Sequence, residues 1–265
     1  MSSKRNRHNG APSFHSPFRP PTRVSRAAGV SRETAPTAIA RETREIVARW
    51  LSDGAFSFRA EFLGRIEAMA ATLALWGSTT NLTADASDPT KTAFHVIDSL
   101  APIVFASDAI RAELESAVGS NANVLDLGSG AGFPGIVLAA AFEARFTLAE
   151  ARRKRVSYLR IASNEMGLAN VAIQQRKLNV SNVATEFDLV TTRAFGAGGD
   201  MYAIAATALR TGGLMLLYAS EDQIRGDHRA LTGGFEGPLV WKYHVPHGDR
   251  IAKRAAILWR KSLKK

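Results

Sequence analysis

The sequence predicts an α/β protein built on a doubly wound parallel sheet that ends in an antiparallel hairpin, with a helical subdomain in front of it. Three observations carry this prediction. From Asn123 onward, short apolar runs with strand character alternate with helical stretches, as in βαβ units. A glycine-rich turn follows the first of these runs directly. Two late β runs stand too close together for a crossover helix, so they should pair antiparallel.

The pattern places each element of this α/β region. We expect strands at residues 123–127, 145–149, 170–174, 187–191, 213–219, 238–245 and 254–260. We expect helices at residues 134–142, 152–166, about 200–210 and 221–231. Five parallel strands followed by an antiparallel hairpin describe the class I S-adenosylmethionine-dependent methyltransferase form of the Rossmann-like sheet, whereas an ordinary dinucleotide-binding fold lacks the hairpin.

The first strand and its turn span Val124–Gly135, which reads Val-Leu-Asp-Leu-Gly-Ser-Gly-Ala-Gly-Phe-Pro-Gly. Glycines at every second position of this turn let the backbone approach a ligand closely, because a Cβ would clash there. Asp126 lies two residues before the first glycine, at the carboxyl end of the strand, where open α/β sheets bind ligands. We therefore expect a nucleoside-cofactor site with contacts from Asp126, Gly128 and Gly130.

Two classes of cofactor compete for this turn. Gly130-x-Gly132-x-x-Gly135 is a literal dinucleotide fingerprint, but counted from Gly128 the third glycine is replaced by Phe133. An acidic residue before the glycines suits S-adenosyl-L-methionine, whose α-amino group is cationic, better than a pyrophosphate. Glu150 ends the next apolar run, about 20 residues on, where a carboxylate can take both ribose hydroxyls of either cofactor. We expect S-adenosyl-L-methionine; the alternatives are a nicotinamide or flavin cofactor, or a βα turn without a ligand.

The segment before the sheet divides into a tail and a helical part. Residues 1–40 are rich in Arg, Ser, Pro and Ala, and the prolines at 17–21 forbid a helix there, so we expect a disordered basic tail. An organelle transit peptide has a similar composition, although the prolines oppose its amphipathic helix. From Arg41, apolar residues recur at helical spacing, and later helices run from Phe62 to Trp76 and around His95. We expect a helical subdomain over 41–120, the α/β domain over 121–261 and a basic tail over 262–265.

Composition excludes several classes of function. The 265 residues include no cysteine, which excludes disulfides, thiolate metal sites and a cysteine nucleophile, and we expect no metal. No run reaches the roughly 20 apolar residues of a membrane span, so we expect a cytoplasmic protein without membrane contact. Of the net charge of +10, residues 1–40 contribute +6 and residues 250–265 contribute +7, which leaves −3 for the body. Charge clustered at chain ends is typical of polyanion binding, or else of a solvated tail.

The catalytic residues that the chain lacks limit which kinds of methyl acceptor it can serve. Methylation of a pyrimidine carbon needs a cysteine adduct, and methylation of an exocyclic amine commonly uses a proline-rich turn after the fourth strand, which is absent at 189–195. A ring nitrogen with a free lone pair, such as guanine N7, only has to be held against the methyl group. Arg193, at the carboxyl edge beside the glycine turn, is the candidate catalytic residue, since it can bind guanine O6, a phosphate or the cofactor's carboxylate. The alternative is a structural pair with Asp188 or Asp200.

Arg152–Arg155, which reads Arg-Arg-Lys-Arg, opens a predicted helix at the same edge. Four cations at a helix N-terminus oppose the helix dipole unless an anion compensates them. RNA phosphate is such an anion, so we expect Lys154 and Arg155 to bind the substrate; a solvated face is the alternative. His95 lies on an amphipathic helix, where a packed or capping histidine is commoner than a catalyst.

Several stretches together resemble one family, the glucose-inhibited division protein B family of bacterial small-subunit ribosomal RNA guanine-N7 methyltransferases. They run in family order over roughly residues 55–220. The stretches are Trp76 with Asn81-Leu82-Thr83, His95 with Asp98-Ser99-Leu100, Asp126–Gly135, Phe146-Thr147-Leu148 with Glu150, Lys154-Arg155-Val156 with Leu159-Arg160, Arg176, and Phe187-Asp188 through Arg193-Ala194-Phe195.

The resemblance implies methyl transfer from S-adenosyl-L-methionine to a guanine in the decoding-region loop of 16S ribosomal RNA, with the small ribosomal subunit as partner. By position it implies cofactor contacts from Gly128, Phe133, Lys177, Leu178 and Arg193, with Glu150 on the ribose. We expect the enzyme to be a monomer.

Three positions depart from the family pattern. The family usually has a lysine near the end of the fifth strand, where this chain has Ala219-Ser220. It usually has a small or acidic residue at the position of Leu178 and aspartate at the position of Glu150. The alternative function is therefore an RNA-binding or ribosome-associated factor with the same fold, which acts on another RNA or has lost catalysis.

Overall fold

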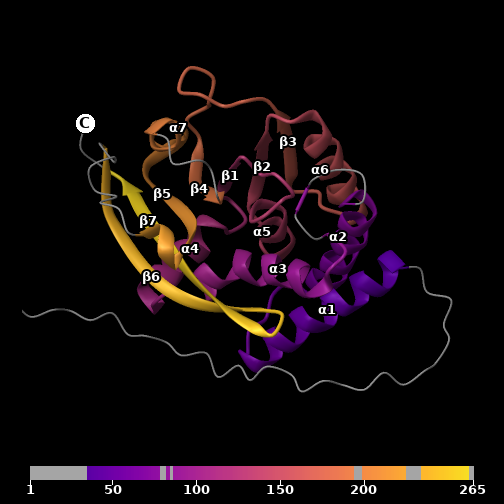
Figure 1. Cartoon of the computed structure of the whole chain (residues 1–265). Helices are drawn as coiled ribbons and strands as arrows, with labels where there is room; N and C mark the ends of the chain where they lie inside the picture. The colour runs from indigo at the N-terminus through magenta and orange to yellow at the C-terminus, as the bar shows by residue number, and fades with distance from the viewer. Residues whose placement is uncertain (1–34, 78–81, 84–85, 194–198, 225–233, 263–265) are drawn as a thin grey trace, which may run out of the picture.

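The computed structural model describes residues 35–77, 82–83, 86–193, 199–224 and 234–262 (Figure 1). Over these residues the centre is a seven-stranded sheet with the order β3-β2-β1-β4-β5-β7-β6. The strands are β1 (Asn123–Leu127), β2 (Arg145–Glu150), β3 (Val171–Gln175), β4 (Phe187–Arg193), β5 (Leu209–Ser220), β6 (Phe235–His247) and β7 (Arg250–Lys261). The first five are parallel, and β7 runs antiparallel to both β5 and β6. This is the strand order of the class I methyltransferase sheet, so the predicted fold class is confirmed.

The helices flank this sheet and precede it. They are α1 (Ala35–Asp53), α2 (Phe62–Gly77), α3 (Pro89–Val104), α4 (Asp108–Ala117), α5 (Gly135–Ala141), α6 (Arg153–Glu165) and α7 (Gly199–Ala208). Within the described ranges no single helix is both long and apolar enough to cross a membrane; α3 and α4 would pass only as a pair, and they are bent by 114° at their junction.

Three elements differ from the sequence-based expectation. α1 begins at Ala35 rather than at Arg41, so the last residues of the expected tail are helical; residues 1–34 and 263–265 lie outside the described part of the chain. α4 was not expected, although Ser107 stands at its N-cap and its apolar face is short. Where a helix was expected at 221–231, Glu221–Ile224 form a 3-10 turn, and residues 225–233 lie outside the described part.

The alternation of side chains along β1 divides the core into two layers. Val124 points to one face and packs in a core that includes residues of α1 to α6. Leu125 and Leu127 point to the other face, which α7 covers with Met201 and Ile204. Figure 1 shows α3 between α1 and the sheet. The N-terminal helices therefore share one apolar core with the sheet that they cover.

The hairpin of β6 and β7 extends beyond the sheet and curves along α3 (Figure 1). β7 pairs with β5 as far as Arg254, whereas its pairing with β6 continues to His247 at the tip. Trp241 Nε1 donates a hydrogen bond of 3.1 Å to the carbonyl of Pro102, and the His247 ring stacks on Phe94 with 4.5 Å between ring centroids. The hairpin is thus attached to α3 at several points along its length.

Asp88 caps the N-terminus of α3, and its loss should destabilise the fold. Its Oδ1 accepts hydrogen bonds from the backbone N–H groups of Thr90 and Lys91, at 2.9 and 3.3 Å. We predict that Asp88→Ala lowers the free energy of unfolding by about 1 kcal/mol. Ser107 is the matched control, because it is the N-cap of α4 but makes no side-chain cap bond. Denaturant unfolding of Asp88→Ala and Ser107→Ala checks this, and equal losses in the two variants would contradict it.

Candidate functional site

A pocket of about 230 Å³ opens at the carboxyl edge of the sheet, where β1, β2, β3 and β4 end. Its lining residues are Leu127, Gly128, Ala149, Glu150, Ala151, Arg152, Arg155, Arg176, Lys177, Leu178 and Arg193. The structure thus brings together six of the ten site residues predicted from the sequence, namely Gly128, Glu150, Arg155, Lys177, Leu178 and Arg193. The other four sequence-predicted residues, Asp126, Gly130, Phe133 and Lys154, are not among the residues that line it.

The turn after β1 needs glycine for two physical reasons. Gly128 and Gly130 have φ angles of +71° and +59°, a left-handed conformation that costs a residue with a Cβ roughly 1 kcal/mol or more. Gly135 is needed for close packing instead, because a Cβ there would lie 2.5 Å from Asp126 Oδ2. A Cβ on Gly132 would meet Ile136 Cγ2 at the same distance of 2.5 Å. The glycines therefore shape the turn and also let α5 approach β1.

Asp126 is buried behind the glycine turn. Its side chain accepts a hydrogen bond of 2.9 Å from the Thr191 hydroxyl on β4 and one of 3.3 Å from the backbone N–H of Gly135. Both carboxylate oxygens are therefore used to hold the start of α5 against β4. Burial raises the pKa of Asp126 to about 6, although the hydrogen bonds that it accepts oppose this shift.

Glu150 is the acidic residue in the lining of the pocket. It is 5% exposed, and Oε2 accepts a 3.0 Å hydrogen bond from the backbone N–H of Gly130. Oε1 accepts a 2.8 Å hydrogen bond from the backbone N–H of Arg152, and Arg155 Nη1 lies 3.7 Å from Oε2. Because a carboxylate offers about four lone-pair positions, Glu150 keeps acceptor capacity for a ligand in the pocket.

Arg193 enters the pocket from the end of β4. Its Nη1 lies 3.5 Å from Asp98 Oδ2, and its Nη2 is hydrogen-bonded to His95 Nδ1. The guanidinium carbon lies 5.9 Å from the ring centroids of both Phe94 and Phe133. Nη1 is buried and makes no hydrogen bond to any described residue. Asp188, one of the two alternative partners, pairs instead with Arg210 at 3.0 Å.

Asp98 is the fully buried centre of a cluster that the sequence analysis did not identify as functional. Arg254 donates to both of its oxygens, from Nε to Oδ1 at 2.9 Å and from Nη2 to Oδ2 at 3.0 Å. The hydroxyl of Tyr243 also donates to Oδ1, at 3.0 Å. Asp98 therefore joins α3, β6 and β7 to Arg193 at the end of β4. The sequence placed Arg254 within a basic chain end, and nothing local marked it as a buried partner.

His95 is uncharged in this setting. Burial, together with the charge of Arg193, the neighbouring His247 and the charge of Arg254, lowers the pKa of His95 to about 3. Its ring lies 5.0 Å from the ring of Phe133, measured between centroids. The sequence favoured a packed or capping histidine over a catalyst, and the ring lies packed beside Phe133.

The remaining cations lie on the surface next to the pocket. Arg152, Arg153 and Lys154 are exposed at the start of α6, whereas Arg155 is half-buried near Glu150. In the described part of the chain, no group of three or more His, Asp or Glu side chains is arranged to hold a metal ion.

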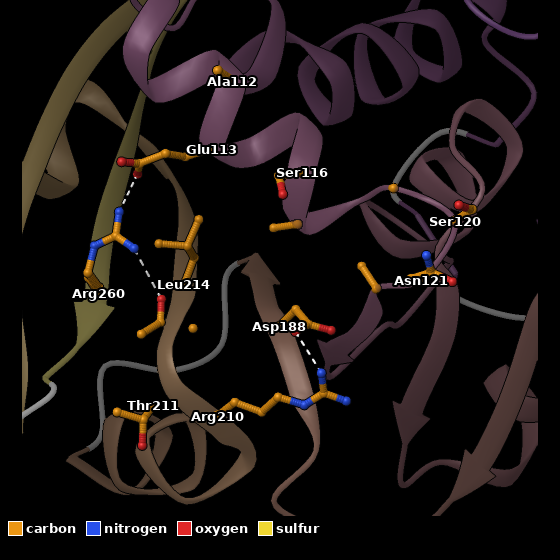
Figure 2. Close-up of a pocket in the computed structure, with 15 residues that line it drawn as sticks. Ala112, Glu113, Ser116, Ser120, Asn121, Asp188, Arg210, Thr211, Leu214 and Arg260 are labelled. Carbon is orange, nitrogen blue, oxygen red and sulfur yellow. Dashed lines mark hydrogen bonds and ion pairs between the residues drawn. The ribbon is translucent and has the colours of Figure 1, made fainter.

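A second and larger hollow of about 920 Å³ lies at the opposite, amino edge of the sheet (Figure 2). Figure 2 shows that its charged side chains pair with one another, Asp188 with Arg210 and Glu113 with Arg260. Asp188 also accepts a 2.8 Å hydrogen bond from the backbone N–H of Asn123. These charges are satisfied within the protein and hold the amino ends of the strands.

Comparison with known proteins decides the family. The family described as “rRNA small subunit methyltransferase G” matches residues 63–233 of the sequence. The chain belongs to this family. The matched range includes the glycine turn and all of the residues that line the pocket at the carboxyl edge, so the resemblance drawn from the motifs is confirmed.

Individual relatives carry the name “Ribosomal RNA small subunit methyltransferase G”. The one from Herminiimonas arsenicoxydans is 34% identical over 143 residues, which cover 52% of this chain and 60% of the relative. The one from Borrelia hermsii is 41% identical over 96 residues, which cover 36% of this chain and 45% of the relative. The one from Coxiella burnetii is 31% identical over 163 residues, which cover 60% of this chain and 74% of the relative. The chain thus matches about half the length of the first two relatives.

The raised pKa of Asp126 predicts a pH-dependent stability. A folded-state pKa of about 6 lies above the ordinary value of 3.8. The protonated Asp126 side chain therefore makes its full contribution to the free energy of unfolding below pH 3.8, and this contribution is lost as the pH rises through 6. Asp126→Asn is uncharged at every pH. We predict that, relative to the native protein, this variant gains up to about 3 kcal/mol of unfolding free energy between pH 4 and pH 7.5. Denaturant unfolding across this range checks it; a difference that does not change with pH would contradict it.

Proposed function

We propose that the protein transfers a methyl group from S-adenosyl-L-methionine to N7 of a guanine in the 16S ribosomal RNA of the small ribosomal subunit. The proposal places it in the cytoplasm and treats it as a monomer. The observation that carries it is a single pocket in which a buried carboxylate, Glu150, and a buried guanidinium, Arg193, line the space beside a glycine turn. The family name supports the class of reaction and the class of RNA.

The lining fits the polar ends of this cofactor. Ribose hydroxyls are donors, and Glu150 retains acceptor capacity beside the turn. The amino-acid part of the cofactor carries a carboxylate, and Arg193 Nη1 has no acceptor among the described residues. Leu178, which is 8% exposed, adds apolar surface to the pocket. Glu150 could hold the ribose of either cofactor, so the dinucleotide alternative is disfavoured instead by the antiparallel hairpin of β6 and β7 and by the family match.

The site suits an acceptor that needs no activation. When bound, the cofactor supplies a methyl group that the N7 lone pair accepts as the carbon–sulfur bond breaks, and no proton has to leave the guanine. The protein then has to orient the two reactants and exclude water. Such an acceptor needs no base, and His95 is not placed to act as one, because Arg193 occupies the lone pair of its Nδ1. Arg193 is the residue that we place in contact with the cofactor.

The exposed cations at the start of α6 supply a surface for RNA phosphates. Arg152, Arg153 and Lys154 stand beside the pocket, and Arg176 and Lys177 approach it from the end of β3. A helix N-terminus repels cations, so this run is unfavourable in the free protein and gains from an anionic partner. The basic residues before position 35 lie outside the described part and remain an expected further contact.

Transfer of label separates catalysis from binding alone. The non-catalytic alternative rests on the departures at Ala219 and Leu178. The purified protein is incubated with small ribosomal subunits that lack the modification and with methyl-labelled S-adenosyl-L-methionine, and the RNA is then digested to nucleosides. We expect label in 7-methylguanosine. RNA that is bound but unlabelled would support the non-catalytic factor, and label in another nucleoside would overturn the N7 assignment.

Substitution in the glycine turn should abolish cofactor binding. Gly128→Asp adds a Cβ at a φ of +71° and a negative charge to a lining that already holds Glu150. Gly167→Asp is the matched control, since Gly167 has a φ of +61° and a Cβ there meets no atom within 4 Å. We predict that calorimetry detects no S-adenosylhomocysteine binding to Gly128→Asp and native-like binding to Gly167→Asp. Native-like affinity in both variants would refute the site.

Charge reversal on α6 should weaken RNA binding without affecting the cofactor. We predict that the double variant Arg153→Glu/Lys154→Glu loses about tenfold or more in affinity for 16S RNA, and that its salt dependence flattens by roughly two phosphate contacts. Arg49→Glu is the control, because Arg49 is exposed on α1 and no residue of α1 lines the pocket. Filter binding over a range of salt concentrations checks this. A salt slope of the double variant equal to that of the native protein would rule out α6 as an RNA contact.

A further inference from the structure

Neither of the two buried carboxylates near Arg193 makes a close charge-assisted hydrogen bond to it. Asp126 accepts from Thr191 and Gly135 and acts on Arg193 only through space. Asp98 is the carboxylate that both Arg193 and Arg254 contact. Arg254 takes both of its oxygens at 2.9 and 3.0 Å, and Tyr243 takes a further lone pair of Oδ1. Arg193 is left with a 3.5 Å approach to Oδ2, which is too long for a good charge-assisted hydrogen bond. Its guanidinium is therefore buried with only partial compensation.

His95 contacts the same guanidinium without adding a charge. Its Nδ1 faces Arg193 Nη2, so the lone pair at Nδ1 accepts and the ring proton stands on Nε2. The groups that surround the ring are Arg193 from β4, Arg254 from β7, His247 from β6, and the rings of Phe94 and Phe133. Cations and apolar rings on all these elements favour a neutral imidazole, in agreement with its low pKa.

We propose that His95 is a positioning residue that orients Arg193 without neutralising it, while Arg254 and Tyr243 occupy Asp98 so that this carboxylate cannot neutralise Arg193 either. The charge of Arg193 then remains available for the carboxylate of the amino-acid part of the cofactor. This inference rests on the proposed function, because it assigns a role in the same pocket. A purely structural cluster would fasten α3 to β4 and β7 equally well with a full ion pair at Arg193.

Two substitutions of equal size at position 95 separate these roles. In histidine the acceptor is Nδ1, which is bonded to Cγ. Asparagine keeps a neutral acceptor at this place, its Oδ1, whereas aspartate has the same shape as asparagine and adds a negative charge. The ligands are S-adenosylhomocysteine, which carries the carboxylate, and 5′-methylthioadenosine, which lacks it. Their affinities for the full chain are measured by calorimetry, and thermal melting reports the fold of each variant.

We expect His95→Asn to bind S-adenosylhomocysteine within about threefold of the native affinity, and His95→Asp to bind it about tenfold or more weakly. Both should bind 5′-methylthioadenosine like the native protein, and His95→Asp should melt no lower than His95→Asn, since it gains an ion pair. Tyr243→Phe is a second variant in case the charge prevents folding. It frees one lone pair of Asp98 for Arg193, so it should weaken S-adenosylhomocysteine binding selectively, by about threefold.

Other outcomes overturn the inference. Equal S-adenosylhomocysteine affinities in His95→Asn and His95→Asp would show that the charge state at position 95 does not matter. Equal weakening of both ligands in His95→Asp would show that the effect is not directed at the carboxylate. A native protein that binds neither ligand would overturn the proposed function, and this inference with it, whereas native binding without discrimination between the variants overturns the inference alone.

Discussion

Two buried carboxylates hold the glycine turn after β1 at two different points, and the pocket depends on this arrangement. Asp126 fixes the end of the turn by accepting from the Gly135 N–H, and Glu150 fixes its middle by accepting from the Gly130 N–H. The two carboxylates have different uses because one is sealed behind the turn and the other lines the pocket. Glycine is required at Gly130 because its φ is +59°, and at Gly135 because a Cβ there would lie 2.5 Å from Asp126 Oδ2.

A third buried carboxylate connects the pocket to the parts of the chain that surround the sheet. Asp98 on α3 meets Arg254 of the terminal hairpin and Arg193 of β4. If Asp98 lost these partners, its buried charge would destabilise the fold. The hairpin, the N-terminal helices and the edge of the sheet are therefore held in one arrangement. This explains why a hairpin that extends beyond the sheet follows α3 instead of projecting into solvent, and why its basic residues include one that serves the site.

The sequence predicts well what depends on near neighbours. The spacing from Gly128 to Gly135 predicted the turn, and the alternation of apolar runs predicted the sheet and its hairpin. Contacts between distant segments were not predictable, because Asp98 and Arg254 are separated by 156 positions and Arg254 stands in no recognisable motif. The direction in which the Asp126 side chain points was not apparent from the sequence either, since the side chain of a residue before a glycine turn can face the ligand or the core. The short apolar face of α4 gave too weak a periodicity to reveal the helix.

The central claim is that the pocket beside the glycine turn receives S-adenosyl-L-methionine, with its ribose at Glu150 and its carboxylate at Arg193. A crystal structure of the protein with S-adenosylhomocysteine tests this most directly. We expect ligand density at the carboxyl edge of the sheet, with both ribose oxygens within hydrogen-bond distance of Glu150 and a carboxylate oxygen on the Arg193 guanidinium. Density at another place, or a ligand whose carboxylate points away from Arg193, would contradict it.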